Sequence, residues 1–360
     1  MQNYKGTQIT FDEAAFYAGI NPQGNQNKVE VLQWFAQSIY KTIKLPNEWS
    51  VRLDEPIVFD TKKGITGEQT ALGTDRPKII VTKGIGLQFN QGARISNLSF
   101  AGGEGVTSVW FGGVAATGNE DDVDGSVQNC TFNIGKRSTA IVYNGRNARI
   151  LNNAFSDGVG GTCISLRWHG IDTQSQEPGD LNETSWRKNR VIGNQFHTGP
   201  ASKAVVINGD YPIYGFQLLN NIMDIGGQML VVERGGMIGS TVTGNSWYGR
   251  SRFGAEGVLE FKTGVLEGLS ITGNGFTTLD GPNKSRCARF VNVASQVDCK
   301  GLAISTNSFI NGRKGKAAVA VHGDTSKVIV IGNVITNSSP KLCGNGGVSF
   351  KSETRVHTNV

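Results

Sequence analysis

The chain has 360 residues, of which 38% are hydrophobic and 18% are charged, and its formal net charge is +6 at pH 7. Both percentages are low for a globular protein, and 49 glycines and many asparagines make up the difference. The lysines and arginines are scattered, which argues against a nucleic-acid-binding arm, and no segment has the ~20 apolar residues of a membrane span. We therefore expect no nucleic acid partner and no membrane insertion. The mildly basic surface could bind an acidic polymer, or it could be that of an ordinary soluble protein with a modest excess of basic residues.

The N-terminal segment is polar and has no apolar signal core. The five cysteines are an odd number without metal-ligand spacing, so we expect reduced, mostly buried thiols and synthesis in a reducing cytoplasm. Abundant glycine and asparagine favour many short strands separated by turns.

Residues 28–41 predict an amphipathic helix, because Val29, Leu32, Phe35, Ala36 and Ile39 recur at helical spacing. Short apolar runs follow in residues 42–60, 78–82 and 84–89, and these predict strands.

From residue 95 onward, one six-residue pattern occurs nine times: aliphatic, any, asparagine or glycine, a fourth position that is usually asparagine, any, large apolar. The segments are ISNLSF (95–100), VQNCTF (127–132), ILNNAF (150–155), VIGNQF (191–196), LLNNIM (218–223), VTGNSW (242–247), ITGNGF (271–276), ISTNSF (304–309) and VIGNVI (330–335). Their fourth positions lie 23 to 41 residues apart, too irregular for a helical repeat. A parallel β-helix allows such variation, because each coil keeps its short strands while its loops change length.

Each position of the pattern has a physical interpretation. Seven of the nine fourth positions are asparagines, whose side-chain amides can hydrogen-bond from coil to coil: Asn153, Asn194, Asn221, Asn245, Asn274, Asn307 and Asn333. The third position holds glycine or asparagine, which tolerate a left-handed backbone, except at Thr306, which fits this interpretation badly. The sixth position predicts an apolar column inside the coils.

We therefore predict an all-β chain, a single-stranded right-handed parallel β-helix with an N-terminal capping helix. The helix would cover the open end of the solenoid. The expected organisation is an N-terminal arm and capping helix in 1–43, the β-helix in 44–351 and a C-terminal tail in 352–360.

The helix followed by TIKLPNEW and PIVFD resembles the N-terminal part of the pectate-lyase-like superfamily, in particular its phage tailspike branch. The resemblance covers most of residues 28–350. It is specific for the fold but not for the activity, since the superfamily contains lyases, hydrolases, esterases and adhesins. No catalytic motif of the family is complete, so no catalytic residue is transferred. The resemblance implies a homotrimer in the virion tail, in contact with other tail proteins.

A second strand follows each repeat, and its alternation predicts which residues face outward. One expected outward column contains Arg167, Glu233 and Lys262, and a neighbouring one contains Glu260 and Arg289. Glu233 and Glu260 would lie on adjacent coils about 8 Å apart, a separation typical of the acid and base of an inverting glycoside hydrolase. The alternative is that Glu233 pairs with Lys262 and Glu260 with Arg289 as ordinary exposed ion pairs.

Two loops carry further candidates for substrate binding. Loop 167–189 contains tryptophans beside carboxylates, and exposed tryptophans in such a setting are typical of sugar binding. Loops of this length in a compact domain usually have a function. An aromatic side chain with two arginines could hold an acidic sugar in loop 246–257. With Arg167 and Lys262, the expected binding residues are Trp168, His169, Asp172, Trp186, Tyr248, Arg250 and Arg252. Residues 119–125 match a calcium loop only in part, so we expect no metal and no other cofactor.

These observations predict a phage tailspike-like virion protein that binds bacterial capsule or O-antigen polysaccharide, with glycosidic hydrolysis as its candidate activity. One alternative is a non-catalytic β-helical adhesin or accessory virion protein. Another is a polysaccharide lyase, with a base such as Lys262 and charge neutralisation by Arg167 or Arg250.

Overall fold

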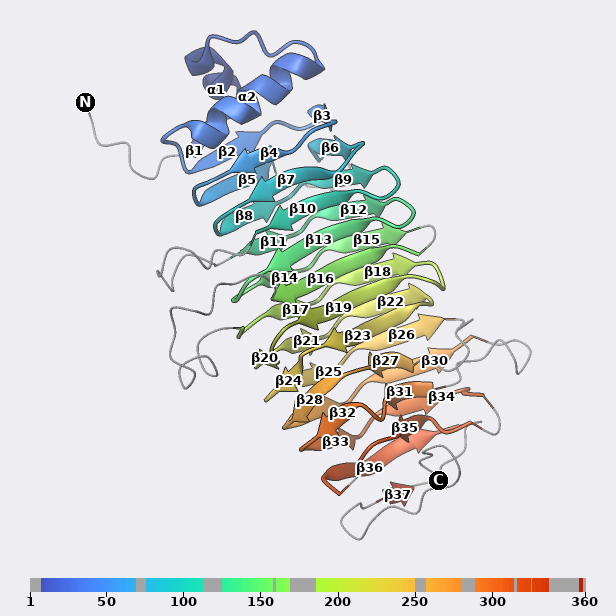
Figure 1. Cartoon of the computed structure of the whole chain (residues 1–360). Helices are drawn as coiled ribbons and strands as arrows, with labels where there is room; N and C mark the ends of the chain where they lie inside the picture. Colours follow the sequence, from blue (N-terminus) through green and yellow to red (C-terminus); the bar gives the residue numbers. More distant parts are fainter. Residues whose placement is uncertain are drawn as a thin grey trace, which may run out of the picture.

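The computed structural model shows a long rod of stacked coils covered at its N-terminal end by two helices (Figure 1). It describes residues 8–68, 76–112, 125–157, 160–168, 186–249, 257–279, 289–313, 316–324, 326–336 and 356–358. Neighbouring strands pair in parallel along the whole rod, for example β16 (Thr162–Trp168) with β19 (Lys203–Gly209). The predicted right-handed parallel β-helix is confirmed.

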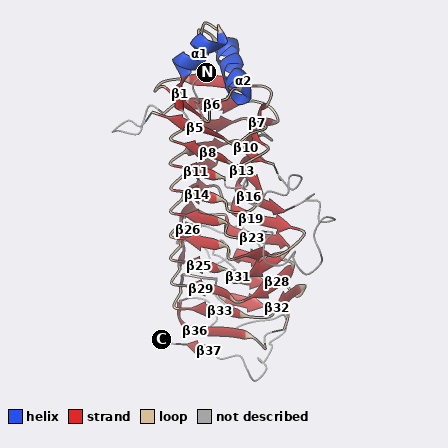
Figure 2. Ribbon diagram, turned by 90° about the vertical axis from the view of Figure 1, so that its left-hand side faces the viewer, coloured by secondary structure: helices blue, strands red, loops and turns tan. Residues whose placement is uncertain are grey.

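The strands form three long faces and one short one, and Figure 2 shows face 1 and face 3 as separate stacks. Face 1 contains β1 (Gln8–Thr10), β2 (Thr42–Leu45), β5 (Lys63–Gly67), β8 (Ala93–Ser96), β11 (Ser126–Gln128), β14 (Arg149–Leu151), β17 (Arg190–Ile192), β21 (Gln217–Leu219), β25 (Thr241–Thr243), β29 (Leu269–Thr272), β33 (Leu302–Ser305), β36 (Val328–Ile335) and β37 (Val356–Thr358). Face 2 contains β3 (Ser50–Leu53), β6 (Lys78–Val81), β9 (Ser99–Gly102), β12 (Thr131–Ile134), β15 (Ala154–Asp157), β18 (Gln195–Thr198), β22 (Ile222–Ile225), β26 (Ser246–Gly249), β30 (Gly275–Thr278) and β34 (Ser308–Ile310), and the end of β36 continues it.

Face 3 is a ten-stranded parallel sheet. Besides β16 and β19 it contains β4 (Ile57–Phe59), β7 (Ile85–Phe89), β10 (Thr107–Phe111), β13 (Thr139–Asn144), β23 (Gln228–Arg234), β27 (Gly257–Phe261), β31 (Arg289–Val293) and β35 (Val319–Val321). The short fourth face consists of β20 (Ile213–Tyr214), β24 (Gly236–Ile238), β28 (Gly264–Glu267) and β32 (Val297–Cys299).

Two helices cover the N-terminal end, whereas the sequence analysis predicted one. Helix α2 (Asn25–Gln37) replaces the predicted 28–41 and ends before Ile39, so Ile39 is 70% exposed and its predicted place on the buried face is wrong. Helix α1 (Phe11–Ala18) was missed although Thr10 and Glu13 form a capping box in which each side chain bonds to the other residue's backbone N–H. The ring of Phe35 in α2 lies 6.3 Å from that of Phe59 in face 3, so the cap joins the core of the coils.

The seven predicted asparagines form a continuous hydrogen-bonded column, which we call the asparagine ladder. In each of its six links, the backbone N–H and the side-chain Nδ2 of one asparagine both donate to Oδ1 of the next, at 2.8–3.0 Å. Each Nδ2 also donates to a backbone carbonyl of the preceding coil, as Asn221 does to Val191 at 2.9 Å. The ladder asparagines are 0–3% exposed, so these bonds satisfy polar groups that water cannot reach.

The residue before each ladder position bends the chain from face 1 to face 2. All nine third positions of the repeat have a φ between 52° and 67°, including Thr306 at 54°. Thr306 thus takes the left-handed conformation that its residue type disfavours, and its Oγ1 donates to the carbonyl of Ser305 at 2.7 Å. The ladder and this bend together fix one corner of the coils.

The interior is filled by stacked side chains in register. Phe100, Phe132, Phe155 and Phe196 follow one another with ring centroids 4.8–5.0 Å apart. A second column runs under face 3 from Phe59 to Tyr143. Cys130, Cys163 and Cys299 are buried cysteines that form no disulfide, as predicted, and burial raises the pKa of Cys130 to about 12.

We predict that Asn221→Ala lowers the free energy of unfolding by about 3 kcal/mol, because it leaves two buried donors of Asn194 without their acceptor. Urea denaturation measures the change. Asn133→Ala, at an exposed position of face 2, is the control and should stay within about 0.5 kcal/mol of the wild type. Equal destabilisation by both substitutions would contradict a stabilising role for the ladder.

Candidate functional site on the outer surface

The inward columns of face 3 match the predicted register. Ile164, Val205, Leu230 and Leu259 pair in sequence from strand to strand, and all four are buried. The outward columns follow by alternation, but pointing outward does not make a side chain accessible here. Most of one outward column is buried, from Val142 at 1% to Ala320 at 0% exposed.

One outward column differs from the prediction at a single position. It runs through Trp110, Val142, Ser165, Val206, Val231, Glu260, Asn292 and Ala320. Asn292 takes the place expected for Arg289, because Arg289 pairs with Gly257 three residues earlier in the strand. The shift brings an amide, and not a guanidinium, directly beside Glu260.

Glu260 is buried, although it points outward from the sheet. It is 4% exposed, whereas the sequence analysis expected an exposed side chain. Its Oε2 accepts a hydrogen bond from the backbone N–H of Gly257 at 2.6 Å, and its Oε1 accepts from Nδ2 of Asn292 at 2.8 Å. Both carboxylate oxygens are therefore engaged, an arrangement that orients Asn292 and holds the start of β27.

Asn292 connects Glu260 to two further polar side chains. Nη1 of Arg289 donates to its Oδ1 at 2.8 Å and lies 3.0 Å from Nε2 of His322. Burial, reinforced by the Arg289 guanidinium, lowers the pKa of His322 below its ordinary value. Because a guanidinium only donates, Nε2 of the neutral imidazole accepts from Arg289, and Nδ1–H remains to donate a hydrogen bond to a ligand oxygen.

Glu233 lies one coil away from Glu260 and is more accessible. Its Oε1 forms an ion pair with Nζ of Lys203 at 2.8 Å, and the two side chains are 32% and 31% exposed. This pair replaces the alternative in which Glu233 pairs with Lys262. Lys262 is half-buried and follows β27, and its backbone N–H donates to the carbonyl of Val232 at 2.9 Å. The predicted column through Arg167 and Glu233 is wrong, because a register shift in β23 pairs Asn208, the neighbour of Arg167, with Arg234.

Arg167 lies further toward the N-terminal end of face 3. Its Nε donates to Oγ of Ser165 at 3.0 Å, and its guanidinium lies 5.7 Å from the ring centre of Trp110. Trp110 is half-buried and heads the outward column, which gives this face an aromatic surface that the sequence analysis missed. Aligning the strand TSVWF (107–111) with the later strands would have identified it.

The two tryptophans predicted to be exposed are buried in the core. Trp168 is 8% exposed and Trp186 is 0% exposed, and their rings stack 6.4 Å apart. They contact the interior of the coils, so neither presents a ring face to a sugar. Four other predicted binding residues lie outside the described part of the chain: His169, Asp172, Arg250 and Arg252. Most of the partial calcium motif, residues 119–124, also lies outside it.

Tyr248 lies on face 2, separate from the other candidates. It belongs to strand β26, not to a loop, and is 49% exposed. Asp224 and His197 precede it in the same outward column, and both are exposed. The structure therefore does not bring Tyr248 together with Glu233 and Glu260.

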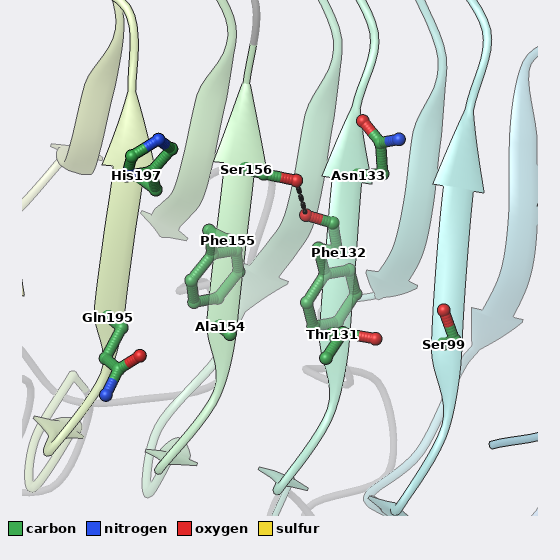
Figure 3. Close-up of a pocket in the computed structure, with 9 residues that line it drawn as sticks. All are labelled: Ser99, Thr131, Phe132, Asn133, Ala154, Phe155, Ser156, Gln195 and His197. Carbon is green, nitrogen blue, oxygen red and sulfur yellow. Dashed lines mark hydrogen bonds between the residues drawn. The ribbon is translucent and has the colours of Figure 1, made fainter. Parts of the chain in front are cut away.

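The same face contains a groove of about 230 Å³, which crosses four neighbouring strands, β9, β12, β15 and β18 (Figure 3). Ala154 stands between Thr131 and Gln195 in one outward column, and its small side chain leaves the groove its depth. Asn133, Ser156 and His197 line its rim. The lining of the groove is mainly apolar, with hydroxyl, amide and imidazole groups around it, so it can hold a ligand by packing and by hydrogen bonds.

Neither a metal-binding group nor a membrane span is found in the described residues. They contain no group of three or more histidine, cysteine, aspartate or glutamate side chains placed to hold a metal ion. No helix among them combines the length and the apolar character needed to cross a bilayer.

No protein-family model matches the sequence, and the search of curated proteins finds no relative. Among solved structures, a double mutant of the tailspike of E. coli bacteriophage HK620 matches with a TM-score of 0.50 and 12% identity, over 91% of this chain and 71% of the other. The chain therefore has the β-helix fold of phage tailspikes.

Two other solved structures have lower scores and show no more than this. A tailspike of an Acinetobacter phage has a TM-score of 0.45 and 12% identity over 90% of this chain, which spans 52% of that tailspike. The surface adhesin PfbA of Streptococcus pneumoniae has a TM-score of 0.49 and 12% identity, over 92% of this chain and 95% of the adhesin.

We predict that acid destabilises the protein partly through His322. Its pKa is lowered in the folded chain, so below roughly pH 6.5 the unfolded chain binds a proton that the folded chain does not. The stability is therefore complete above that pH and falls as the pH drops toward the folded pKa. His322→Gln should lose less stability than the wild type between about pH 7.5 and about pH 5.5.

Thermal unfolding at a series of pH values measures this difference. Asn133→Ala, at an exposed position of face 2, removes no titratable group, so it is the control and should keep the wild-type pH dependence. An unchanged pH dependence in His322→Gln would contradict the assignment.

Proposed function

We propose that the protein is a tailspike-like component of a phage virion that binds bacterial surface polysaccharide, capsule or O-antigen, along face 3. The observation that carries the proposal is a polar strip in which Lys203, Glu233 and His322 are half-buried and reach solvent, whereas Glu260 and Asn292 are buried. It passes over consecutive coils through Lys203, Glu233, Glu260, Asn292 and His322. Five coils at about 4.8 Å each give a strip on the order of 20 Å long, which suits an extended polymer more than a small molecule.

The chemistry of the strip supports sugar recognition. Arg289 and Lys203 supply donors, Glu233 supplies an acceptor, and the ring of Trp110 with Arg167 above it provides an apolar surface further along the same face. Hydrogen bonds within the network preorganise these groups, which reduces the entropy lost on binding. The homotrimer and the contacts with other tail proteins belong to the same proposal.

The adjacency of Glu233 and Glu260 supports a second candidate function, hydrolytic cleavage of the bound polysaccharide. Glu233 is accessible enough to act on a glycosidic bond or on a water, whereas Glu260 would have to exchange its bonds with Gly257 and Asn292 before it could transfer a proton. Binding to the accessible side chains, Lys203, Glu233 and His322, therefore leaves the bonds of Glu260 intact, whereas hydrolysis by the glutamate pair would break them.

We predict that Arg289→Gln weakens binding of the recognised polysaccharide at least about tenfold, because it removes a charge-assisted donor. Purified capsule and O-antigen polysaccharides would be screened by isothermal titration calorimetry. Arg52→Gln, an exposed arginine on face 2, is the control and should bind like the wild type. Equal affinities for all three proteins would rule out face 3 as the binding surface.

We predict that Glu233→Gln abolishes any release of reducing ends while binding persists, because the amide cannot exchange a proton with the glycosidic oxygen or water. A reducing-end assay on the polysaccharide that binds measures cleavage, and Glu267→Gln is the control on the short fourth face. Products that absorb as unsaturated uronates would indicate a lyase and contradict hydrolysis. Cleavage that continues in Glu233→Gln would remove the glutamate pair from the mechanism.

A further inference from the structure

Face 1 carries a column of exposed arginines that the proposed function does not use. Arg94, Arg149 and Arg190 occupy the same outward position of β8, β14 and β17, and Ser126 of β11 stands between the first two. All three side chains are exposed. Arg149 and Arg190 are direct neighbours across one pair of strands.

The arginine column has no acidic partner in the described part of the chain. None of the three guanidinium groups forms an ion pair or a side-chain hydrogen bond there. The strands of face 1 from β2 to β36 contain neither aspartate nor glutamate. Like charges opposite each other on adjacent strands are unfavourable, so an anion that binds between them would relieve a repulsion built into the fold.

A fourth arginine lies beside the column, at the corner of the coil that contains Ser126. Nη1 of Arg76 donates to the carbonyl of Asn129 at 2.6 Å, and Asn129 directly follows β11 at the corner of the coil that contains Ser126. Four consecutive coils therefore each present a guanidinium on or beside face 1. Their spacing is set by the coil repeat of about 4.8 Å.

An aliphatic column runs next to the arginines on the same face. Leu151, Ile192 and Leu219 are aligned from strand to strand, and each is half-buried, with part of its side chain in contact with solvent. The two columns give the surface a charged strip and an apolar strip, both parallel to the rod. Such a pair of strips complements a chain of sugar rings, whose C–H groups pack on aliphatic side chains while an acidic substituent reaches the arginines.

We propose that face 1 binds an acidic polysaccharide, one that carries a carboxylate on each sugar, in an extended conformation along the arginine column. One pyranose unit of such a chain advances by a distance similar to one coil, so successive carboxylates meet successive guanidinium groups, each of which can bind bidentately. No described strand of face 1 contains a phenylalanine, tyrosine or tryptophan, which disfavours single-stranded nucleic acid, whose bases stack on aromatic rings. The inference concerns a different surface from face 3 and depends on the proposed function only for the choice of a glycan.

The test compares the full-length wild type with Arg149→Gln/Arg190→Gln. The matched control, Lys83→Gln/Lys136→Gln, removes two exposed positive charges from turns between face 2 and face 3. The probes are polygalacturonate, neutral dextran and oligothymidylate, and binding is measured by calorimetry at several salt concentrations. We expect the arginine variant to bind polygalacturonate at least about tenfold more weakly and with a shallower salt dependence, and the lysine variant to bind like the wild type. The melting temperature of the arginine variant should not fall, since a repulsion is removed.

Three results would overturn the inference. The arginine variant could bind polygalacturonate like the wild type, the lysine variant could lose as much affinity as the arginine variant, or oligothymidylate could bind more tightly than polygalacturonate. Arg289→Gln on face 3 separates the two proposals, because it should leave polygalacturonate binding to face 1 unchanged. A loss of that binding in Arg289→Gln, with none in the arginine variant, would assign the acidic polymer to face 3.

Discussion

The coil-to-coil hydrogen bonding of the asparagine ladder is the constraint on which the rest of the molecule depends. From Asn194 to Asn333, each ladder amide accepts two donors from the preceding asparagine and donates to that coil's backbone, so these coils must turn the same corner at the same height. The buried rings then stack in register, and the outward residues form straight columns. A shift by one residue in any coil would break the ladder and turn its apolar side chains outward.

This regularity makes the outer surface a set of parallel strips, each with its own chemistry. Face 3 contains a hydrogen-bonded polar network, and face 1 presents arginines beside aliphatic side chains. Face 2 contains the groove, and Tyr248 lies on the same face but outside the groove. A rod with strips parallel to its axis is suited to a ligand that is itself long and repetitive. The buried, fully bonded Glu260 and the ion-paired Glu233 favour a surface built to hold such a ligand, with catalysis as an additional step.

The fold could be predicted from the sequence because its signals recur. The asparagines, the left-handed corners and the aromatic column each appear in many coils, so a single exception such as Thr306 does not hide them. The candidate site could be predicted only in part, because it depends on features that occur once. The offset of Arg289 from Asn292 decided which side chain meets Glu260, and the burial of Trp168 and Trp186 depends on packing that alternation does not encode. Helix α1 was missed despite its capping box, since eight residues give little periodicity.

Hydrogen–deuterium exchange with and without a bound acidic polysaccharide tests most directly the claim that ligands bind the outward columns of a rigid rod. The account predicts added protection in peptides that contain β14 and β17, or β27 and β31, and unchanged, slow exchange in the buried ladder segments around Asn221 and Asn245. Protection confined to the capping helices α1 and α2, or ladder amides that exchange rapidly in the free protein, would contradict it.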